Sequence, residues 1–113
     1  MNLNADFPYK IQNSSMILPM PTVADIQVTR GCISHLDYGL KNFSIKCLIL
    51  DTTGEFQLSS VNFGFMMTLS KFCQDNKIEM KLVCNKQKVL DMFDLLKIRH
   101  IFKVYPTLEE ALI

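Results

Sequence analysis

Hydrophobic and polar residues follow two different periods along the chain, and these periods predict strands that alternate with helices. In "IKCLILD", all residues from Cys47 to Leu50 are apolar, which is typical of a strand covered on both faces of a sheet. In "IEMKLVC", residues 78–84, apolar and charged side chains alternate, which predicts a second strand. Apolar residues at helical spacing in residues 60–76 and 86–98 predict two helices.

The remaining segments extend this alternation in both directions. We expect short strands at residues 7–12 and 15–21, with the turn-forming "NSS" between them, followed by a helix that ends at Gly39. A last strand, "IFKVY", precedes a short closing helix, "LEEALI". Three residues with hydroxyl or amide side chains are expected to cap helices: Thr22, Asn85 and Thr107.

The order of these elements predicts an α/β fold. Helices that connect consecutive strands imply right-handed crossovers and a largely parallel sheet. We therefore expect a single domain over residues 1–113. Its centre should be a mixed, mostly parallel sheet of about four to five strands, with about four helices packed on it.

Composition and charge exclude several classes of partner. The chain is 49% hydrophobic and 20% charged, and Lys plus Arg number 12 against 11 for Asp plus Glu. The formal net charge of +1 gives no electrostatic reason to expect nucleic-acid binding. No apolar run approaches the ~20 residues that span a bilayer, and the N-terminal residues lack the pattern of a signal peptide. We expect a cytoplasmic protein that does not insert into membranes.

Cysteine and histidine residues show no ligand spacing. The four cysteines are far apart and lie among apolar neighbours, so we interpret them as small buried hydrophobic residues: Cys32, Cys47, Cys73 and Cys84. His35 and His100 lie in different segments and are expected to be surface or half-buried residues. We therefore expect no metal and no cofactor.

Motifs of known catalytic sites are also absent from the sequence. There is no glycine-rich phosphate loop, no HExxH and no GxSxG. Asp51 ends a central strand, where α/β enzymes often place a working carboxylate. The following "TTG" favours the alternative that Asp51 caps a turn by accepting a backbone hydrogen bond two residues on. The turn-capping role of Asp51 argues against the hypothesis of a small enzyme that uses this carboxylate in catalysis.

Two adjacent serines, Ser59 and Ser60, stand where the strand-to-helix connection meets the predicted helix. Either hydroxyl can accept a hydrogen bond from a free backbone N–H in the first turn. A phosphate at this position would add nearly two negative charges at a helix N-terminus, where anions are tolerated. The junction is therefore either a helix cap or a site of modification that changes the surface without disturbing the fold.

The helix that follows has two apolar faces. On a helical wheel, five apolar residues lie on one side, which we expect to face the core, and Met66 lies at the margin of that side. The five are Val61, Phe65, Leu69, Phe72 and Cys73. Phe63 and Met67 fall on nearly the opposite side, among polar residues. Large apolar side chains on such a face indicate a protein contact, unless a neighbouring loop or helix covers them.

The segment from residue 45 to 113 resembles the STAS domain of bacterial anti-sigma factor antagonists. In that family a strand that ends in Asp is followed, eight residues later, by Asp-Ser-Ser-Gly or Asp-Thr-Ser-Gly, with a further Gly two residues on. Counting from Asp51 places Ser59 at the motif's Asp and Ser60 at its phosphorylated residue, and Gly64 matches the second Gly. The ending "KVLDMFDLLKIRHIFKVYPTLEEAL" also follows the family's pattern.

The resemblance implies a non-enzymatic binding domain whose partner is a serine-kinase anti-sigma factor. It implies that Ser60, with Ser59 as the second candidate, is phosphorylated, and that this weakens partner binding. The implied partner surface has six members: Ser59, Ser60, Asn62, Phe63, Gly64 and Met67. Asp51 supports the turn, and the protein is expected to be a monomer or a weak homodimer.

The chain departs from the family motif at Ser59, at Val61, which replaces the second Ser, and at Asn62. Ser59 replaces a carboxylate beside the acceptor, and Asn62 replaces a glycine where a kinase approaches. These departures leave an alternative open, in which a divergent STAS protein binds its partner constitutively. Such a protein would serve in a signalling assembly or as an accessory subunit of a lipid-transport complex.

Overall fold

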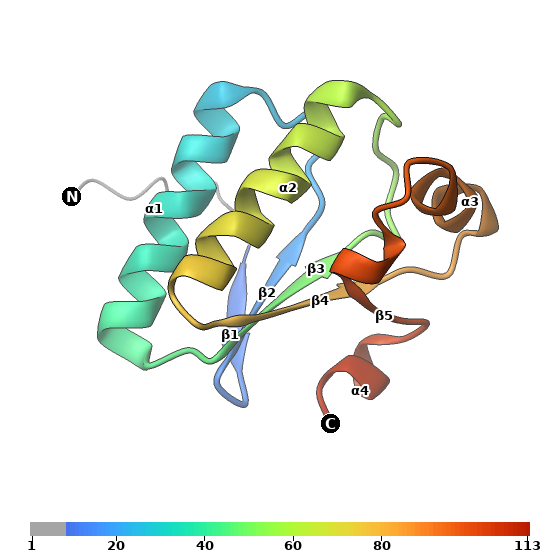
Figure 1. Ribbon diagram of the computed structural model, residues 1–113. Helices are drawn as coiled ribbons and strands as arrows, with labels where there is room; N and C mark the ends of the chain where they lie inside the picture. Colours follow the sequence, from blue (N-terminus) through green and yellow to red (C-terminus); the bar gives the residue numbers. More distant parts are fainter. Residues whose placement is uncertain (1–8) are drawn as a thin grey trace.

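A five-stranded mixed sheet forms the centre of the computed structural model, which describes residues 9–113 (Figure 1). The strands are β1 (Lys10–Gln12), β2 (Ser15–Pro19), β3 (Cys47–Asp51), β4 (Glu79–Val83) and β5 (Lys103–Tyr105). They lie in the sheet in the same order as in the chain. β1 and β2 are antiparallel, and all other neighbours are parallel.

Four helices cover the sheet unequally. They are α1 (Ile26–Phe43), α2 (Ser60–Asp75), α3 (Gln87–Leu95) and α4 (Leu108–Ala111), and a 3₁₀ turn, η1 (Arg99–Ile101), follows α3. When parallel strands follow chain order, right-handed crossovers place every connecting helix on the same face. The main core accordingly joins α1, α2 and α3 to one face of the sheet, whereas α4 packs on the other face (Figure 1). The predicted fold class is confirmed.

β3 is buried on both faces, as its apolar run predicts. Leu48 and Leu50 belong to the main core beneath α1, α2 and α3. Ile49 points to the opposite face and contacts the smaller cluster around α4. The predicted turn between the first two strands is also present, since Asn13 and Ser14 have φ angles of 53° and 62° that suit a tight hairpin. Residues 7 and 8 of the first predicted strand lie outside the described residues.

The prediction that Thr22 caps the first helix is wrong. The N-cap is Asp25, whose side chain accepts a hydrogen bond from the backbone N–H of Val28 at 2.9 Å. The backbone carbonyl of Thr22 instead accepts a hydrogen bond from the backbone N–H of Gln57 at 3.0 Å. Thr22 therefore belongs to a contact between two loops and not to the helix.

The prediction that Gly39 ends this helix is also wrong. α1 continues to Phe43 and ends at Ser44, which adopts the left-handed conformation with φ 51°. Gly39 is buried, and a Cβ atom there would lie 2.8 Å from the Cε atom of Met16 on β2. The glycine therefore allows the helix to approach the sheet closely, which is a packing role.

The two remaining predicted caps differ in outcome. Asn85 does not cap α3, because the N-cap position is Lys86 and no side chain makes the capping hydrogen bond. Thr107 caps α4 as predicted, and its hydroxyl accepts a hydrogen bond from the backbone N–H of Glu110 at 3.2 Å.

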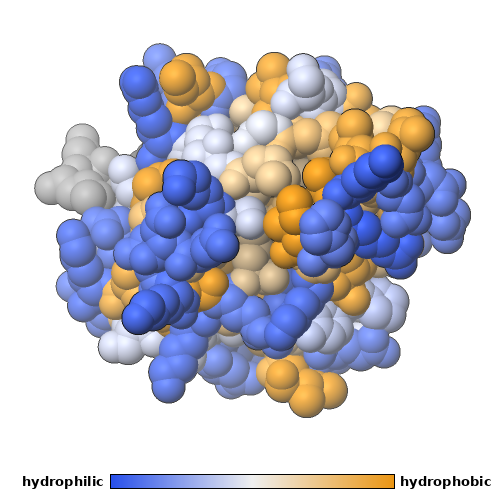
Figure 2. Space-filling model, in the orientation of Figure 1, coloured by the Kyte–Doolittle hydropathy of each residue, from blue (hydrophilic) through white to orange (hydrophobic). Residues whose placement is uncertain are grey.

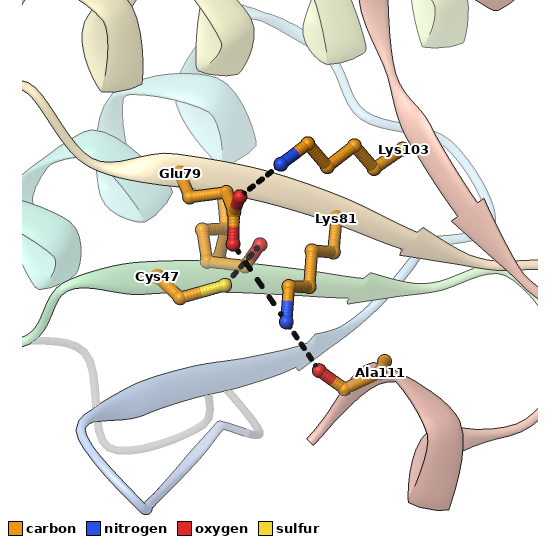
Figure 3. A network of polar contacts seen from close by, with 6 residues as sticks. Cys47, Glu79, Lys81, Lys103 and Ala111 are labelled. Carbon is orange, nitrogen blue, oxygen red and sulfur yellow. Dashed lines mark hydrogen bonds and ion pairs between the residues drawn. The ribbon is translucent and has the colours of Figure 1, made fainter. Parts of the chain in front are cut away.

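A buried lysine attaches α4 to the sheet (Figure 3). Lys81 projects from β4, and its Nζ atom donates a hydrogen bond to the carbonyl of Ala111 at 2.7 Å. The same Nζ atom lies 3.7 Å from Oε1 of Glu79 and 5.3 Å from the centre of the Tyr105 ring. Lys103 donates a hydrogen bond to Glu79, which holds the pKa of that carboxyl below its usual range. The alternation in "IEMKLVC" placed Lys81 on a polar face, but α4 covers that face.

The predicted burial of the cysteines is confirmed. All four are buried and free, and burial raises the pKa of Cys73 to about 12 and also raises the pKa of Cys32 and of Cys47. The prediction for His35 is wrong, because it is buried and its ring centre lies 4.8 Å from that of Tyr9. His100 is exposed, as expected.

The left-handed conformation of Ser44 predicts the effect of a substitution. Glycine adopts this conformation without the steric penalty of a Cβ atom. We expect Ser44→Gly to raise the free energy of unfolding by about 0.5 to 1 kcal/mol in urea denaturation. Ser44→Ala is the control, because it keeps the Cβ atom, and an equal gain from alanine would contradict the explanation.

Candidate functional site

The start of α2 separates the roles of the two adjacent serines. Ser59 is the N-cap, and its Oγ atom accepts a hydrogen bond from the backbone N–H of Asn62 at 3.3 Å. Ser60 is the first helical residue and is exposed. Its hydroxyl makes no hydrogen bond to any part of the chain that the structure describes. The cap is therefore Ser59, and the hydroxyl of Ser60 is accessible.

Asn62 is fully buried and connects three segments. Its Oδ1 atom accepts a hydrogen bond from the backbone N–H of Ala24 at 2.7 Å. Its Nδ2 atom donates to the carbonyls of Thr22, at 2.9 Å, and of Gln57, at 2.7 Å. The structure thus contradicts the predicted place of Asn62 on the partner surface, because its side chain is fully used in holding the loops before α1 and α2 together.

Lys86 makes a second set of contacts that hold the loop between β3 and α2. The Nζ atom of Lys86 donates a hydrogen bond to the carbonyl of Gly54 at 2.5 Å and lies 3.9 Å from Oε1 of Glu55. It also lies 5.9 Å from the centre of the Phe56 ring. Sequence reasoning missed this residue, since no local pattern links Lys86 to a loop about thirty positions earlier.

Asp51 caps the turn at the end of β3, as predicted. Its Oδ1 atom accepts hydrogen bonds from the backbone N–H of Thr53 at 2.9 Å and from the Thr53 hydroxyl at 2.7 Å. The next residue, Thr52, is buried and donates from its hydroxyl to the carbonyl of Val83 at 2.8 Å. The carboxylate of Asp51 is therefore occupied in fixing the loop.

The exposed apolar side chains of α2 differ in part from the prediction. Met67 is 37% exposed, as expected for the outer face. Phe63 is only half-buried, because its ring meets that of Phe93 of α3 edge-on at a centre-to-centre distance of 6.0 Å. Val61, expected in the core, is 50% exposed. α2 lies between α1 and α3, so its buried face is rotated away from Val61 and toward Phe63.

A groove of about 490 Å³ runs between the first half of α2 and the end of α3. Five residues of the predicted partner surface line it together with four other apolar residues: Ser59, Ser60, Phe63, Gly64, Met67, Leu58, Met92, Leu96 and Ile98. Among residues 9–113, no charged side chain lines this groove. Figure 2 shows apolar surface beside α2, on the side toward α3.

The comparison with known families identifies the family of this chain. The STAS domain profile matches residues 8–111, which is nearly the whole chain. The chain belongs to the STAS family. No curated protein sequence matches the chain.

Several solved structures have the same fold as this chain. TM1081 of Thermotoga maritima, which has been proposed as an anti-sigma factor antagonist, has a TM-score of 0.74 and 24% identity over 95% of this chain and 92% of its own. A variant of RsbS from Moorella thermoacetica has a TM-score of 0.75 and 12% identity, and the coverages are 96% and 95%. The Bacillus cell fate determinant SpoIIAA, solved in its phosphorylated form, has a TM-score of 0.66 and 10% identity, with coverages of 93% and 95%. At these identities the similarity shows the fold.

Two kinds of feature, a metal site and a membrane-spanning helix, are absent from the part of the chain that the structure describes. Within residues 9–113, no group of three or more His, Cys, Asp or Glu side chains could hold a metal ion. None of the helices in that range is long and apolar enough to cross a membrane.

The buried network of Asn62 predicts an order of stabilities. Asn62→Ala leaves the Ala24 N–H and the Gln57 carbonyl without these partners, so we expect a loss of about 2 to 4 kcal/mol in the free energy of unfolding. Ser59→Ala removes the helix cap and should cost about 1 kcal/mol. Ser60→Ala, which removes an exposed hydroxyl, should leave stability unchanged within about 0.5 kcal/mol. Urea denaturation of the three variants tests the order, and an Asn62→Ala protein as stable as the wild type would contradict it.

Proposed function

We propose that this STAS domain is a regulatory protein-binding module of the anti-sigma factor antagonist type, without enzymatic activity of its own. The groove between α2 and α3 is the contact surface for the partner. Its apolar lining with uncharged hydroxyls resembles the core of a protein interface, where charged residues are depleted. The structural similarity to TM1081 and SpoIIAA supports this class of function.

We further propose that the partner is a serine-kinase anti-sigma factor and that it phosphorylates Ser60. The observation that carries this proposal is the exposed hydroxyl of Ser60, free of hydrogen bonds to the described residues, at the edge of an uncharged groove. Ser59 is a poorer site of phosphorylation because its Oγ atom caps the helix. A phosphate on Ser60 would place nearly two negative charges beside an apolar contact and thereby weaken binding. Such a kinase partner would place the protein in the cytoplasm.

The buried position of Asn62 removes one objection to phosphorylation. The glycine of the family motif leaves space near the acceptor, and an asparagine there would obstruct a kinase if its side chain pointed outward. In this chain the side chain points inward and makes its three hydrogen bonds with Ala24, Thr22 and Gln57. Asn62 therefore leaves the approach to Ser60 open.

The second candidate function is constitutive binding of a partner. It is favoured by Ser59, because no carboxylate stands directly before Ser60 in this chain. In that case the groove still binds a partner, and both serines have only structural roles. In this second candidate the protein serves in a signalling assembly or as the accessory subunit of a lipid-transport complex.

Phosphorylation distinguishes the two candidates. The purified protein is incubated with the serine-kinase anti-sigma factor of its own organism and ATP, and its intact mass is measured. We expect a gain of one phosphate that is lost in Ser60→Ala and kept in Ser59→Ala. If the Ser60→Ala protein still gains a phosphate, Ser60 is not the phosphorylated residue. If the wild type binds the kinase tightly but gains no phosphate, constitutive binding is favoured.

Gly64 allows the groove to be tested without destabilising the fold. Gly64 is an exposed helical residue of α2, and no atom lies within 4 Å of where its Cβ would be. Gly64→Ala should therefore stabilise the protein by about 1 kcal/mol. The added methyl group also narrows the groove, so we expect the affinity for the partner to fall by about fivefold or more in calorimetric titration.

Gly54→Ala is the matched control for this substitution. A Cβ atom at Gly54 would also meet nothing within 4 Å, but Gly54 lies in the loop outside the groove. The Gly54→Ala protein should bind the partner with the same affinity as the wild type. Wild-type affinity in Gly64→Ala would show that the partner does not use the groove.

A further inference from the structure

A second hollow lies along α2 beyond the groove. It has a volume of about 570 Å³ and is lined by Met67, Ser70, Lys71, Cys73, Gln74, Ile78, Met80 and Ile101. Three of its lining residues, Cys73, Ile78 and Met80, are apolar and buried. Ser70, Lys71 and Gln74 of α2 give it a polar side. Ile101 of η1 forms its far wall and is 38% exposed.

The groove and the hollow adjoin at Met67, and we call the two together the furrow. Met67 lines both, and the α2 residues of the two linings recur every three to four positions from Ser60 to Gln74. On the opposite side the wall passes from Ile98 to Ile101. At 1.5 Å per residue, the furrow follows α2 for ~20 Å. This length matches about four turns of a second helix.

The furrow has one charged group at its far end. In the part of the chain that the structure describes, Lys71 is the only charged residue that lines either hollow. Its Nζ atom lies 3.4 Å from Oδ2 of Asp75, in an exposed pair one helical turn apart. Such surface pairs contribute little in water, so a carboxylate from a partner can replace Asp75. An occupant with an acidic side chain at this end can therefore pair with Lys71.

We propose that the whole furrow binds one amphipathic helix of the partner protein, with a carboxylate of that helix over Lys71. The proposal rests on the proposed function and extends its contact surface from Ser60 to η1. The apolar face of the helix packs against Phe63, Met67 and Ile101. Helical ligands bind apolar grooves through side chains three to four positions apart, and methionine adapts to irregular surfaces.

This arrangement separates the regulated end of the contact from the unregulated end. Ser60 and Lys71 are eleven residues apart on α2, which is ~16 Å along the helix axis. That distance exceeds the Debye length of ~8 Å at physiological ionic strength. Phosphorylation of Ser60 therefore weakens one end of the contact and leaves the other intact.

Two substitutions at the far end test the proposal by calorimetric titration with the serine-kinase anti-sigma factor. We expect Ile101→Ala to weaken binding by about tenfold and Lys71→Gln by about threefold. The effect of Lys71→Gln should be the same with and without Ser60→Asp, since the two sites do not interact. Thermal denaturation confirms that each variant is folded.

Matched controls exist for both substitutions. Leu95→Ala removes an apolar side chain that is 75% exposed but lines neither hollow. Lys41→Gln removes the same kind of ion pair on α1, where Lys41 lies 2.9 Å from Asp37. Both controls should bind as tightly as the wild type.

The outcomes distinguish this proposal from the proposed function. If Gly64→Ala weakens binding but Ile101→Ala and Lys71→Gln do not, the groove is the contact and the extended furrow is refuted. If none of the three weakens binding, the proposed function fails as well. If Ile101→Ala instead dissociates a dimer of the isolated chain in sedimentation experiments, a second copy occupies the furrow and the proposal is overturned.

Discussion

The buried side chain of Asn62 is the interaction on which the arrangement of the site depends. It gives one acceptor and two donors to backbone groups of Ala24, Thr22 and Gln57, and so joins the loop before α1 to the loop before α2. Unpaired polar groups are costly inside a protein, which makes any other placement of these loops unfavourable. With both loops fixed, Ser59 caps α2 and Ser60 faces solvent.

The topology of the sheet explains why α2 carries the contact surface. Strands in chain order place α1, α2 and α3 side by side on one face, and α2 is the middle helix. Its flank toward α3 is only partly filled, because α3 spans nine residues against sixteen in α2. The uncovered length lies beside η1, where Ile101 remains 38% exposed.

Sequence patterns predicted the fold well because most of the elements have a local cause. The apolar run of β3, the cap at Thr107 and the turn at Asp51 all appear as expected. The errors at Asn62 and Lys81 have a non-local cause, since each side chain is buried by segments about thirty to forty positions away. For the site, spacing from Asp51 located the two serines, but only the structure showed which one is the cap.

The uncharged lining of the groove also bears on how fast a complex can form. A formal net charge of +1 and an uncharged groove give little long-range attraction toward a charged partner. Without such steering, protein association proceeds at about 10⁵–10⁶ M⁻¹ s⁻¹ and changes little with ionic strength. The lifetime of the complex, set by dissociation, would then decide how quickly such a regulator responds.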